Sequence, residues 1–343
     1  MYGNFTIKEN PVILGIESSC DETAAAVIRG RKILSNVIFS SATEQAKYGG
    51  VVPEIASRAH ADAVDEAAAK AVKEAGLTLK DIDAVAVTYG AGLLGALLVG
   101  VSFAKALAYA LNVPLIAVNH IRGHLAAAYL SDEDLKPPFI TLLASGGHTA
   151  ILHTQSYTKF SYLGGTSDDA AGEAFDKAAR VLSLPYPGGP NVERLARNGN
   201  SSIPFPPSLV KNSSKLQFSF SGLKTAVINY CNSAKMRGEE INYSDVAASF
   251  QTAALDPLVK KTVECALSTG SGTVTAGGGV AANTYLREKL VESCEKYGLK
   301  PVLPEKKFCT DNAAMIAAEG LIQYNCRNFA GLDLNAKAQI PLI

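Results

Sequence analysis

The stretch PVILGIESSCDETAAAVIRGRKILSNVIF, residues 11–39, decides the fold that this sequence predicts. Its three apolar runs, residues 11–18, 23–29 and 32–39, are separated by short turns rich in polar residues and glycine. Apolar runs of this length with short polar turns between them are typical of antiparallel strands joined as hairpins. The chain is therefore expected to open with a three-stranded antiparallel sheet.

The rest of the chain repeats one order of strands and helices. After residue 39, the first half is expected to alternate helices and strands at 53–75, 83–88, 93–111, 114–118 and 119–130. The second half is expected to begin with strands at 139–144, 149–154 and 159–163, and to end with a helix at 313–324. Allowing for inserted helices, the order β-β-β-α-β-α-β-α recurs. The sequence therefore predicts a duplicated α/β fold.

The boundary between the two halves is expected at Lys136-Pro137-Pro138. Residues 1–136 would form a first domain that carries two closely spaced histidines. Residues 137–343 would form a second domain with glycine-rich turns and a helical insertion. One alternative stays open, in which the last helix packs back on the first domain.

Composition limits the class of protein. The chain has 343 residues, of which 48% are hydrophobic and 19% charged, as expected for a compact folded protein. Its 32 basic and 32 acidic residues give no net charge, so unaided binding of nucleic acid is not expected. Six cysteines without a Cys-x-x-Cys pair argue against a zinc ribbon or a disulfide framework, and favour a reducing, cytoplasmic compartment. The apolar stretch 91–111 is interrupted by polar and glycine residues, so it predicts a buried helix and no membrane association.

The sequence suggests a metal site around two histidines. His120 and His124 are four residues apart, and Asn119 before them can cap a helix that would place both imidazoles on one face. This spacing can also arise by chance at a solvated helix end. Asp311, in a polar turn before the last helix, is the best candidate for a third ligand. Its alternative role is a plain helix N-cap.

Small polar turns suggest nucleotide binding. Each half begins with a strand-turn-strand unit, whose turns lie at Glu17–Asp21 and Ser145–His148, and their backbone N–H groups can surround phosphate oxygens. Gly277-Gly278-Gly279 and the nearby Asn283 suit close approach to a ribose or a ring. The alternatives are that the two turns are plain hairpin turns and that the triple-glycine segment is a helix-capping loop. The triple-glycine segment has neither the G-x-G-x-x-G spacing of a dinucleotide-binding fold nor the lysine of a P-loop, which argues against both of those classes.

Together the chain contains eight ordered motifs that resemble one known family. They are GIESSCDET at 15–23, GGVVPE at 49–54, HIRGH at 120–124, SGGHT at 145–149, DDAAGEAFDK at 168–177, YPGGP at 186–190, FSFSGLKT at 218–225 and CTDN at 309–312. The chain resembles the TsaD family, the bacterial tRNA N6-adenosine threonylcarbamoyltransferases, which are related to the Kae and Qri proteins. The resemblance covers residues 12–325.

The resemblance implies an actin-like, Hsp70-like (ASKHA) fold with two domains and a central cleft. It implies transfer of a threonylcarbamoyl group from threonylcarbamoyl-AMP to N6 of adenosine 37 in tRNAs that read ANN codons. The family's metal ligands fall on His120, His124 and Asp311. Its adenylate contacts fall on Leu143, Ala144, Ser145, Gly146, Gly147, Asp176, Gly189, Glu193 and Asn283. Glu193 departs from the aspartate expected in many relatives.

The resemblance also implies a cofactor and partners. The cofactor would be one divalent metal ion, Fe²⁺ in the family, although imidazole and carboxylate ligands also suit Zn²⁺ or Mg²⁺. The partners would be tRNA, a TsaB-like paralogue and a TsaE-like ATPase. Asp21 and Glu22 are plausible proton acceptors, but no catalytic base is assigned. The alternatives are a metallopeptidase and an actin-fold ATPase. This chain lacks the glutamate of His-Glu-x-x-His that the first would use, and it lacks the aspartate that the second would place in its second phosphate turn.

Overall fold

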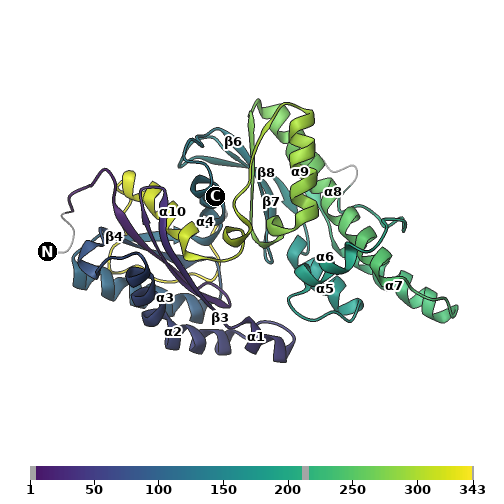
Figure 1. The fold of residues 1–343 in the computed structure, drawn as a ribbon, viewed down its shortest axis with the longest axis horizontal. Helices are drawn as coiled ribbons and strands as arrows, with labels where there is room; N and C mark the ends of the chain where they lie inside the picture. The colour runs from purple at the N-terminus through teal and green to yellow at the C-terminus, as the bar shows by residue number, and fades with distance from the viewer. Residues whose placement is uncertain (1–4, 211–215, 342–343) are drawn as a thin grey trace. The chain divides into compact units, whose positions relative to one another are not determined.

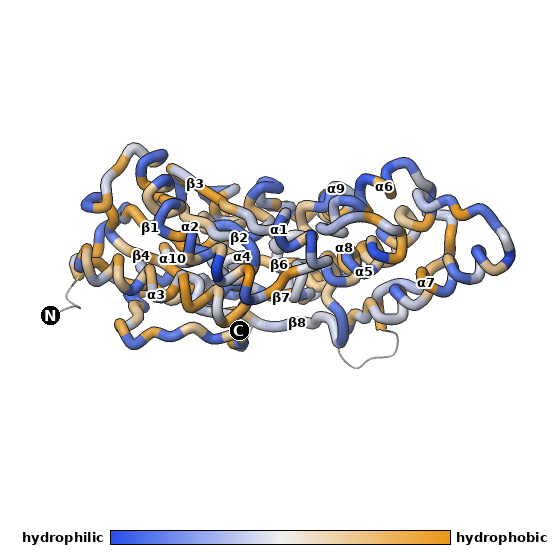
Figure 2. The backbone as a smooth tube through the Cα atoms, turned by 90° about the horizontal axis from the view of Figure 1, so that it is seen from below, coloured by the Kyte–Doolittle hydropathy of each residue, from blue (hydrophilic) through white to orange (hydrophobic). Residues whose placement is uncertain are grey.

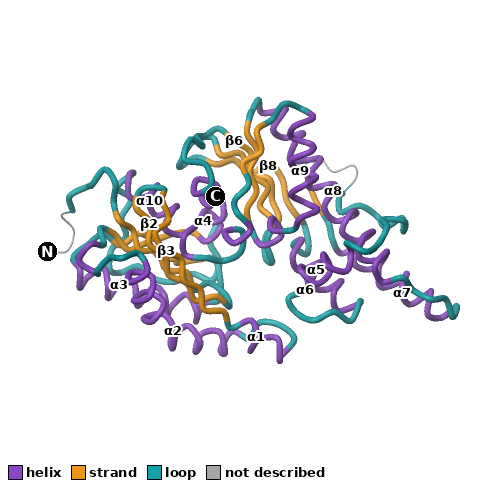
Figure 3. Tube along the Cα trace, viewed as in Figure 1, coloured by secondary structure: helices purple, strands orange, loops and turns teal. Residues whose placement is uncertain are grey.

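The computed structural model describes residues 5–210 and 216–341, which form two compact α/β units (Figure 1). Unit 1 consists of Met1–Leu135 together with Asp311–Ile343, and unit 2 of Lys136–Thr310. Each unit is built on one mixed sheet with helices on its faces (Figure 3).

The sheet of unit 1 has five strands in the order β3-β2-β1-β4-β5. They are β1 (Val12–Glu17), β2 (Glu22–Arg29), β3 (Lys32–Ser40), β4 (Ala84–Gly90) and β5 (Leu115–Asn119). The first three strands pair antiparallel, which confirms the expected opening sheet, whereas β4 and β5 run parallel to β1.

Helices cover both faces of this sheet. Alternate residues of β1 point to opposite faces, so Leu14 packs with α2 and α3 while Ile13 packs with α10. The helices are α2 (Pro53–Glu74), α3 (Leu94–Leu111), α4 (His120–Ala126) and α10 (Ala313–Asn325). Shorter turns are α1 (Ala42–Gln45), η1 (Ala46–Tyr48), η2 (Leu79–Asp81) and η3 (Ala127–Leu130).

The sheet of unit 2 repeats this topology. Its order is β11-β10-β6-β7-β8-β9, in which β11-β10-β6-β7-β8 corresponds to β5-β4-β1-β2-β3. The strands are β6 (Phe139–Ala144), β7 (Thr149–Thr154), β8 (Phe160–Thr166), β9 (Leu216–Phe218), β10 (Thr273–Gly277) and β11 (Lys300–Val302). The duplication expected from the sequence is thus present, and the added edge strand β9 is one that the sequence did not predict.

Helices also flank the second sheet. They are α5 (Ala171–Val181), α6 (Gly188–Ala196), α7 (Ser221–Met236), α8 (Tyr243–Thr269) and α9 (Thr284–Lys296), with the short turns η4 (Gly279–Ala282) and η5 (Lys306–Phe308). The core of the unit joins β6, β7 and β10 to α5, α7, α8 and α9. This arrangement leaves the turns after β6 and β10 at the ends of neighbouring strands.

The C-terminal segment belongs to unit 1, which corrects the expected second domain of residues 137–343. Helix α10 lies directly on β1 and β4 because glycines replace side chains at the contact. A Cβ at Gly15 would lie 2.4 Å from the backbone oxygen of Ala313, and one at Gly320 would lie 2.6 Å from Cβ of Ala86. The last helix therefore packs on the first sheet, which is the alternative that the sequence left open.

Helix α3 is the one helix in the described part of the chain that is long and apolar enough to span a membrane by those criteria alone. Many helices inside folded domains meet the same criteria. Its buried residues recur every three or four positions from Ala96 to Ala108 and pack toward α2 and β4. Its other face exposes Leu94, Leu98 and Tyr109, so the helix is half-buried rather than fully buried as expected. Hydrophobic residues, drawn in orange, recur along α3 (Figure 2).

Candidate metal centre and nucleotide-binding residues

The two histidines and Asp311 meet within unit 1. Strand β5 leads straight into α4, and the Asn119 side chain accepts a hydrogen bond from the Ile121 N–H at 2.9 Å, as a helix N-cap does. His120 and His124 therefore lie one turn apart, with ring centroids 4.7 Å from each other. Their Nε2 atoms lie 3.5 and 3.3 Å from Oδ1 of Asp311.

Asp311 is not the N-cap of α10. That role belongs to Asn312, whose Oδ1 accepts a hydrogen bond from the Met315 N–H at 3.0 Å. Asn312 thus satisfies the start of the helix, and the carboxylate of Asp311 is turned toward the two imidazoles instead. The alternative role considered for Asp311 is wrong for this fold.

The three side chains can hold one metal ion. One ligand atom from each lies within 4.8 Å of the others. Imidazole nitrogens and carboxylate oxygens bind zinc at about 2.0–2.2 Å, so atoms 3.3–3.5 Å apart can share one ion. His120 and His124 are 9% and 2% exposed, and such a shielded group with three protein ligands leaves coordination positions open.

The ionisable groups of this centre shift one another's pKa values. Burial lowers the pKa of His120, but the Asp311 and Glu17 carboxylates outweigh it and raise that pKa to about 9. Burial raises the pKa of Asp311, yet His120 and His124 lower it to about 2. Glu17 behaves likewise, because His120 lowers its pKa against the effect of burial. The centre is a mutually stabilised cluster of buried ionisable groups.

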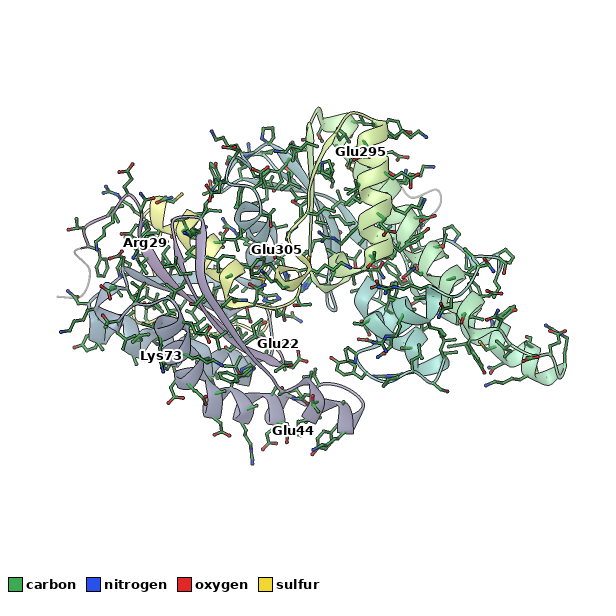
Figure 4. The ribbon with its side chains drawn as sticks, in the orientation of Figure 1. Glu22, Arg29, Glu44, Lys73, Glu295 and Glu305 are labelled. Atoms are coloured by element: carbon green, nitrogen blue, oxygen red, sulfur yellow. The ribbon has the colours of Figure 1, made fainter. Side chains whose placement is uncertain are left out.

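The turn between β1 and β2 carries two further carboxyl groups. Burial and the neighbouring Asp21 raise the pKa of Glu22 to about 9, so one proton is held at this turn near neutral pH. Glu22 begins β2, where Figure 4 labels it. His60 supports the turn from α2, since its ring nitrogens lie 2.7 Å from Thr23 Oγ1 and 2.9 Å from the carbonyl oxygen of Cys20.

Sequence reasoning missed the buried residues that support the metal centre. Glu17 contacts Nδ1 of His120. Glu319 forms an ion pair with Arg122, which stands between the two histidines in the sequence. Each is the one acidic residue in a largely apolar element, VILGIE in β1 and AAMIAAEGLIQYN in α10. A carboxylate at such a position is a usable signal, because a buried charge needs a partner.

In unit 2 the Ser145–His148 turn follows β6, which contributes Leu143 and Ala144. The Ser145 N–H donates to the His148 carbonyl at 2.8 Å. Gly146 and Gly147 have open space where a Cβ would stand. The turn is therefore accessible to a ligand.

Two other glycines let neighbouring segments approach this turn. A Cβ at Gly172, near the start of α5, would lie 2.8 Å from the Gly146 Cα. At Gly278, where φ is +91°, a Cβ would lie 2.4 Å from the Ala144 oxygen. The start of α5 and the triple-glycine segment thus converge on the Ser145–His148 turn.

Asp176 and Gly189 lie at a second point of unit 2, where α5 meets the start of α6. Oδ1 of Asp176 accepts a hydrogen bond from the Gly188 N–H at 2.7 Å. Burial raises the pKa of Asp176, although the N–H groups of Gly188 and Gly189 oppose that effect. Asp176 therefore already binds peptide N–H groups of its own chain.

Glu193 and Asn283 lie close to a pocket of about 400 Å³. Oε1 of Glu193 contacts the Thr284 N–H at 3.3 Å, and Glu193 lines the pocket. Asn283 is the N-cap of α9, and its amide nitrogen donates to Gln251 at 2.9 Å. Among the nine expected contact residues Glu193 alone lines this pocket. Asn283 lies next to the lining residue Thr284, and the other seven lie at the end of β6, in the turn that follows it, or where α5 meets α6.

Comparison with known proteins supports the family reading. The family model described as TsaD, tRNA N6-adenosine threonylcarbamoyltransferase, matches residues 32–318. A protein of that name from Clostridium botulinum (strain Kyoto / Type A2) is 50% identical over 338 residues, which cover 98% of this chain and 99% of the relative. One from Clostridium perfringens (strain SM101 / Type A) is 50% identical over 333 residues, covering 96% and 98%.

Solved structures establish the fold. Full-length HypF in a phosphate- and nucleotide-bound form matches with a TM-score of 0.61 at 15% identity, over 93% of this chain and 47% of HypF. An activator of 2-hydroxyisocaproyl-CoA dehydratase from Clostridium difficile with bound ADPNP matches at 0.51 and 14% identity, over 92% and 97%. The fold is actin-like. With the family model covering most of the chain, the protein is a transferase that belongs to the tRNA N6-adenosine threonylcarbamoyltransferase family.

Proposed function

We propose that this protein, acting in the cytoplasm, transfers the threonylcarbamoyl group of threonylcarbamoyl-AMP to N6 of adenosine 37 in tRNAs that read ANN codons. The observation that carries the proposal is the convergence of His120, His124 and Asp311 in a member of this family. Two imidazoles and a carboxylate that leave positions open suit the oxygen atoms of an adenylate. The donor is already an activated mixed anhydride, so no covalent enzyme intermediate is required.

The metal in this proposal is one divalent ion, Fe²⁺, with Zn²⁺ or Mg²⁺ as alternatives. The buried Nε2 atoms and the Asp311 carboxylate fit such an ion. When bound, it would supply Lewis-acid stabilisation of charge on phosphate or carbonyl oxygens. Asp311 would balance part of the ion's charge, and His120 and His124 would keep the ligand geometry fixed through α4.

The adenylate in this proposal is bound by unit 2. The N–H groups of Gly146 and Gly147 would hold phosphate oxygens, helped by the start of α5, since helix N-termini favour anions. Glu193 and Asn283 would contact the ribose. The proposed contacts in full are Leu143, Ala144, Ser145, Gly146, Gly147, Asp176, Gly189, Glu193 and Asn283.

Partners are part of the proposal because the chain has no net charge. Binding of tRNA usually relies on several lysine or arginine contacts to phosphates, and 32 basic residues are here balanced by 32 acidic ones. We propose a TsaB-like paralogue that binds unit 1 and a TsaE-like ATPase. The exposed Leu94, Leu98 and Tyr109 on α3 support an apolar contact on unit 1.

The test is reconstitution. The protein is incubated with threonine, bicarbonate, ATP, an adenylate-forming enzyme, the two partners and unmodified tRNA, and the tRNA is digested to nucleosides for mass analysis. Threonylcarbamoyladenosine is expected with the wild type and with the Asp134→Ala control, which alters an exposed loop of unit 1. The Asp311→Ala variant should form little threonylcarbamoyladenosine. Product from repeated turnover without either partner would refute the partner requirement.

Elemental analysis tests the metal centre separately. His120→Ala, His124→Ala and Asp311→Ala should each lose most bound metal and keep their secondary structure, because the ligands are not part of the apolar core. Stoichiometric metal in the His124→Ala variant would refute this site.

A further inference from the structure

Glu17 is a buried carboxylate whose contacts lead to the candidate metal centre. It is the last residue of β1, and its side chain is 0% exposed. Oε1 accepts a hydrogen bond from the Ser19 N–H at 2.5 Å, and Oε2 accepts one from the Thr88 hydroxyl at 2.6 Å. Oε2 also lies 3.2 Å from Nδ1 of His120. Two neutral donors thus fix the carboxylate against one imidazole.

This contact involves the ring nitrogen that does not face Asp311. His120 presents Nε2 to Asp311 at 3.5 Å and Nδ1 to Glu17. A neutral imidazole carries its proton on one nitrogen and a lone pair on the other. The position of that proton therefore decides whether Nε2 can bind a metal ion.

We propose that Glu17 is a positioning residue for the metal centre, holding the proton of His120 on Nδ1 so that the Nε2 lone pair is free for the metal. The inference rests on the proposed function, because it assumes that His120 is a ligand. An ionised carboxylate only accepts hydrogen bonds, so it selects the Nδ1–H form. Partners of this kind orient metal-binding histidines and increase their basicity.

Ser19 makes a contact with the same nitrogen but cannot select the proton position. Its Oγ lies 3.1 Å from Nδ1 of His120. A hydroxyl can accept from Nδ1–H or donate to a bare Nδ1, so both ring forms satisfy it. Removing the Ser19 hydroxyl and changing the Glu17 carboxylate therefore have different consequences at one and the same atom.

His124 provides an internal contrast. Its Nδ1 is buried and has no hydrogen-bond partner among the described residues. No carboxylate of the described residues fixes the proton of His124 as Glu17 does for His120, so Glu17 acts on one ligand of the pair. Effects of a change at Glu17 should appear in the His120 ring and be weaker in the His124 ring.

The test compares Glu17→Gln with Ser19→Ala. If the glutamine oxygen keeps the Ser19 N–H, its amide nitrogen replaces Oε2 and donates to Nδ1, which forces the proton onto Nε2. Zn²⁺ affinity, measured by competition with a chelator, should fall by about 10- to 100-fold in Glu17→Gln. Ser19→Ala should bind Zn²⁺ nearly as tightly as the wild type. Thermal unfolding of each apoprotein shows that the comparison is made on folded chains.

A second measurement does not depend on the variants. Nitrogen NMR of the zinc-loaded wild type with labelled histidine should show His120 bound through Nε2 and protonated on Nδ1. The reverse assignment would overturn the inference even if Glu17→Gln does not fold. Equal Zn²⁺ affinity in wild type and folded Glu17→Gln would also overturn it, while the metal site would stand. A wild type that binds no metal at all would instead refute the proposed metal centre.

Discussion

Arg122 and Glu319 form an ion pair between α4 and α10, with Nε of Arg122 2.9 Å from a carboxylate oxygen of Glu319 that is almost fully buried. Helix α4 carries both histidines, and Asp311 lies just before α10. The pair therefore joins the helix that carries two candidate metal ligands to the helix that directly follows the third. Its loss should affect stability and metal binding together.

Replacing Arg122 should be costly when Glu319 is ionised. At pH 8, Arg122→Met would leave a buried carboxylate without its counter-charge, at an expected cost of about 3–5 kcal/mol in the free energy of unfolding. The double variant Arg122→Met/Glu319→Gln buries no charge and should recover much of that loss. Urea titration of the three proteins measures both effects, and a double variant no more stable than the single one would contradict the pairing.

The pH dependence of stability should reveal Glu319. Burial raises its pKa from 4.5 to about 7, although the Arg122 charge opposes this shift. The folded protein then keeps a proton that the unfolded chain releases, so this group's contribution to stability should decline between pH 4.5 and 7 and stay constant above. The difference in unfolding free energy between wild type and Glu319→Gln, followed over this range, isolates the contribution. A flat difference would argue against the raised pKa.

Gly123 allows α4 to approach α10. A Cβ at this position would lie 2.7 Å from Cδ1 of Ile316, so Gly123→Ala should destabilise the protein by about 1–3 kcal/mol through overpacking. Metal affinity should fall as well, because Gly123 lies between the two histidines. Ile316→Val removes the clashing methyl group, and Gly123→Ala/Ile316→Val should regain both properties. Failure of this rescue would show that the contact is not the cause.

Asp176→Ala and Asn283→Ala should each weaken adenylate binding by about 1–3 kcal/mol, the cost of leaving a buried polar partner unpaired. Calorimetry with a non-hydrolysable adenylate analogue measures this. Asn283 also caps α9, so loss of a cap must be separated from loss of a ligand contact. Asn242→Ala removes the corresponding side-chain cap of α8 and should leave affinity unchanged. Unchanged affinity in both test variants would place the nucleotide elsewhere.

The sequence alone determined the features that depend on neighbours along the chain. Apolar runs with short turns predicted the three strands that open each sheet, since strand formation and turn chemistry are set within a few residues. The four-residue spacing of His120 and His124, with Asn119 as cap, predicted their common helix face. The order of these local elements was enough to reveal the duplication.

Only the tertiary structure decided what Asp311, Glu17 and Glu319 do. Asp311 is far from the histidines in sequence, and the local pattern allowed either a third ligand or the N-cap of the last helix. The structure shows Asn312 as the N-cap and Asp311 beside the imidazoles. Glu17 contacts Thr88 in β4 and His120 at the start of α4. Glu319 pairs with Arg122 because α10 packs against α4 and the sheet of unit 1. Contacts between distant segments arise from packing and from the need to pair buried charges, and neither leaves a periodic signal in the chain.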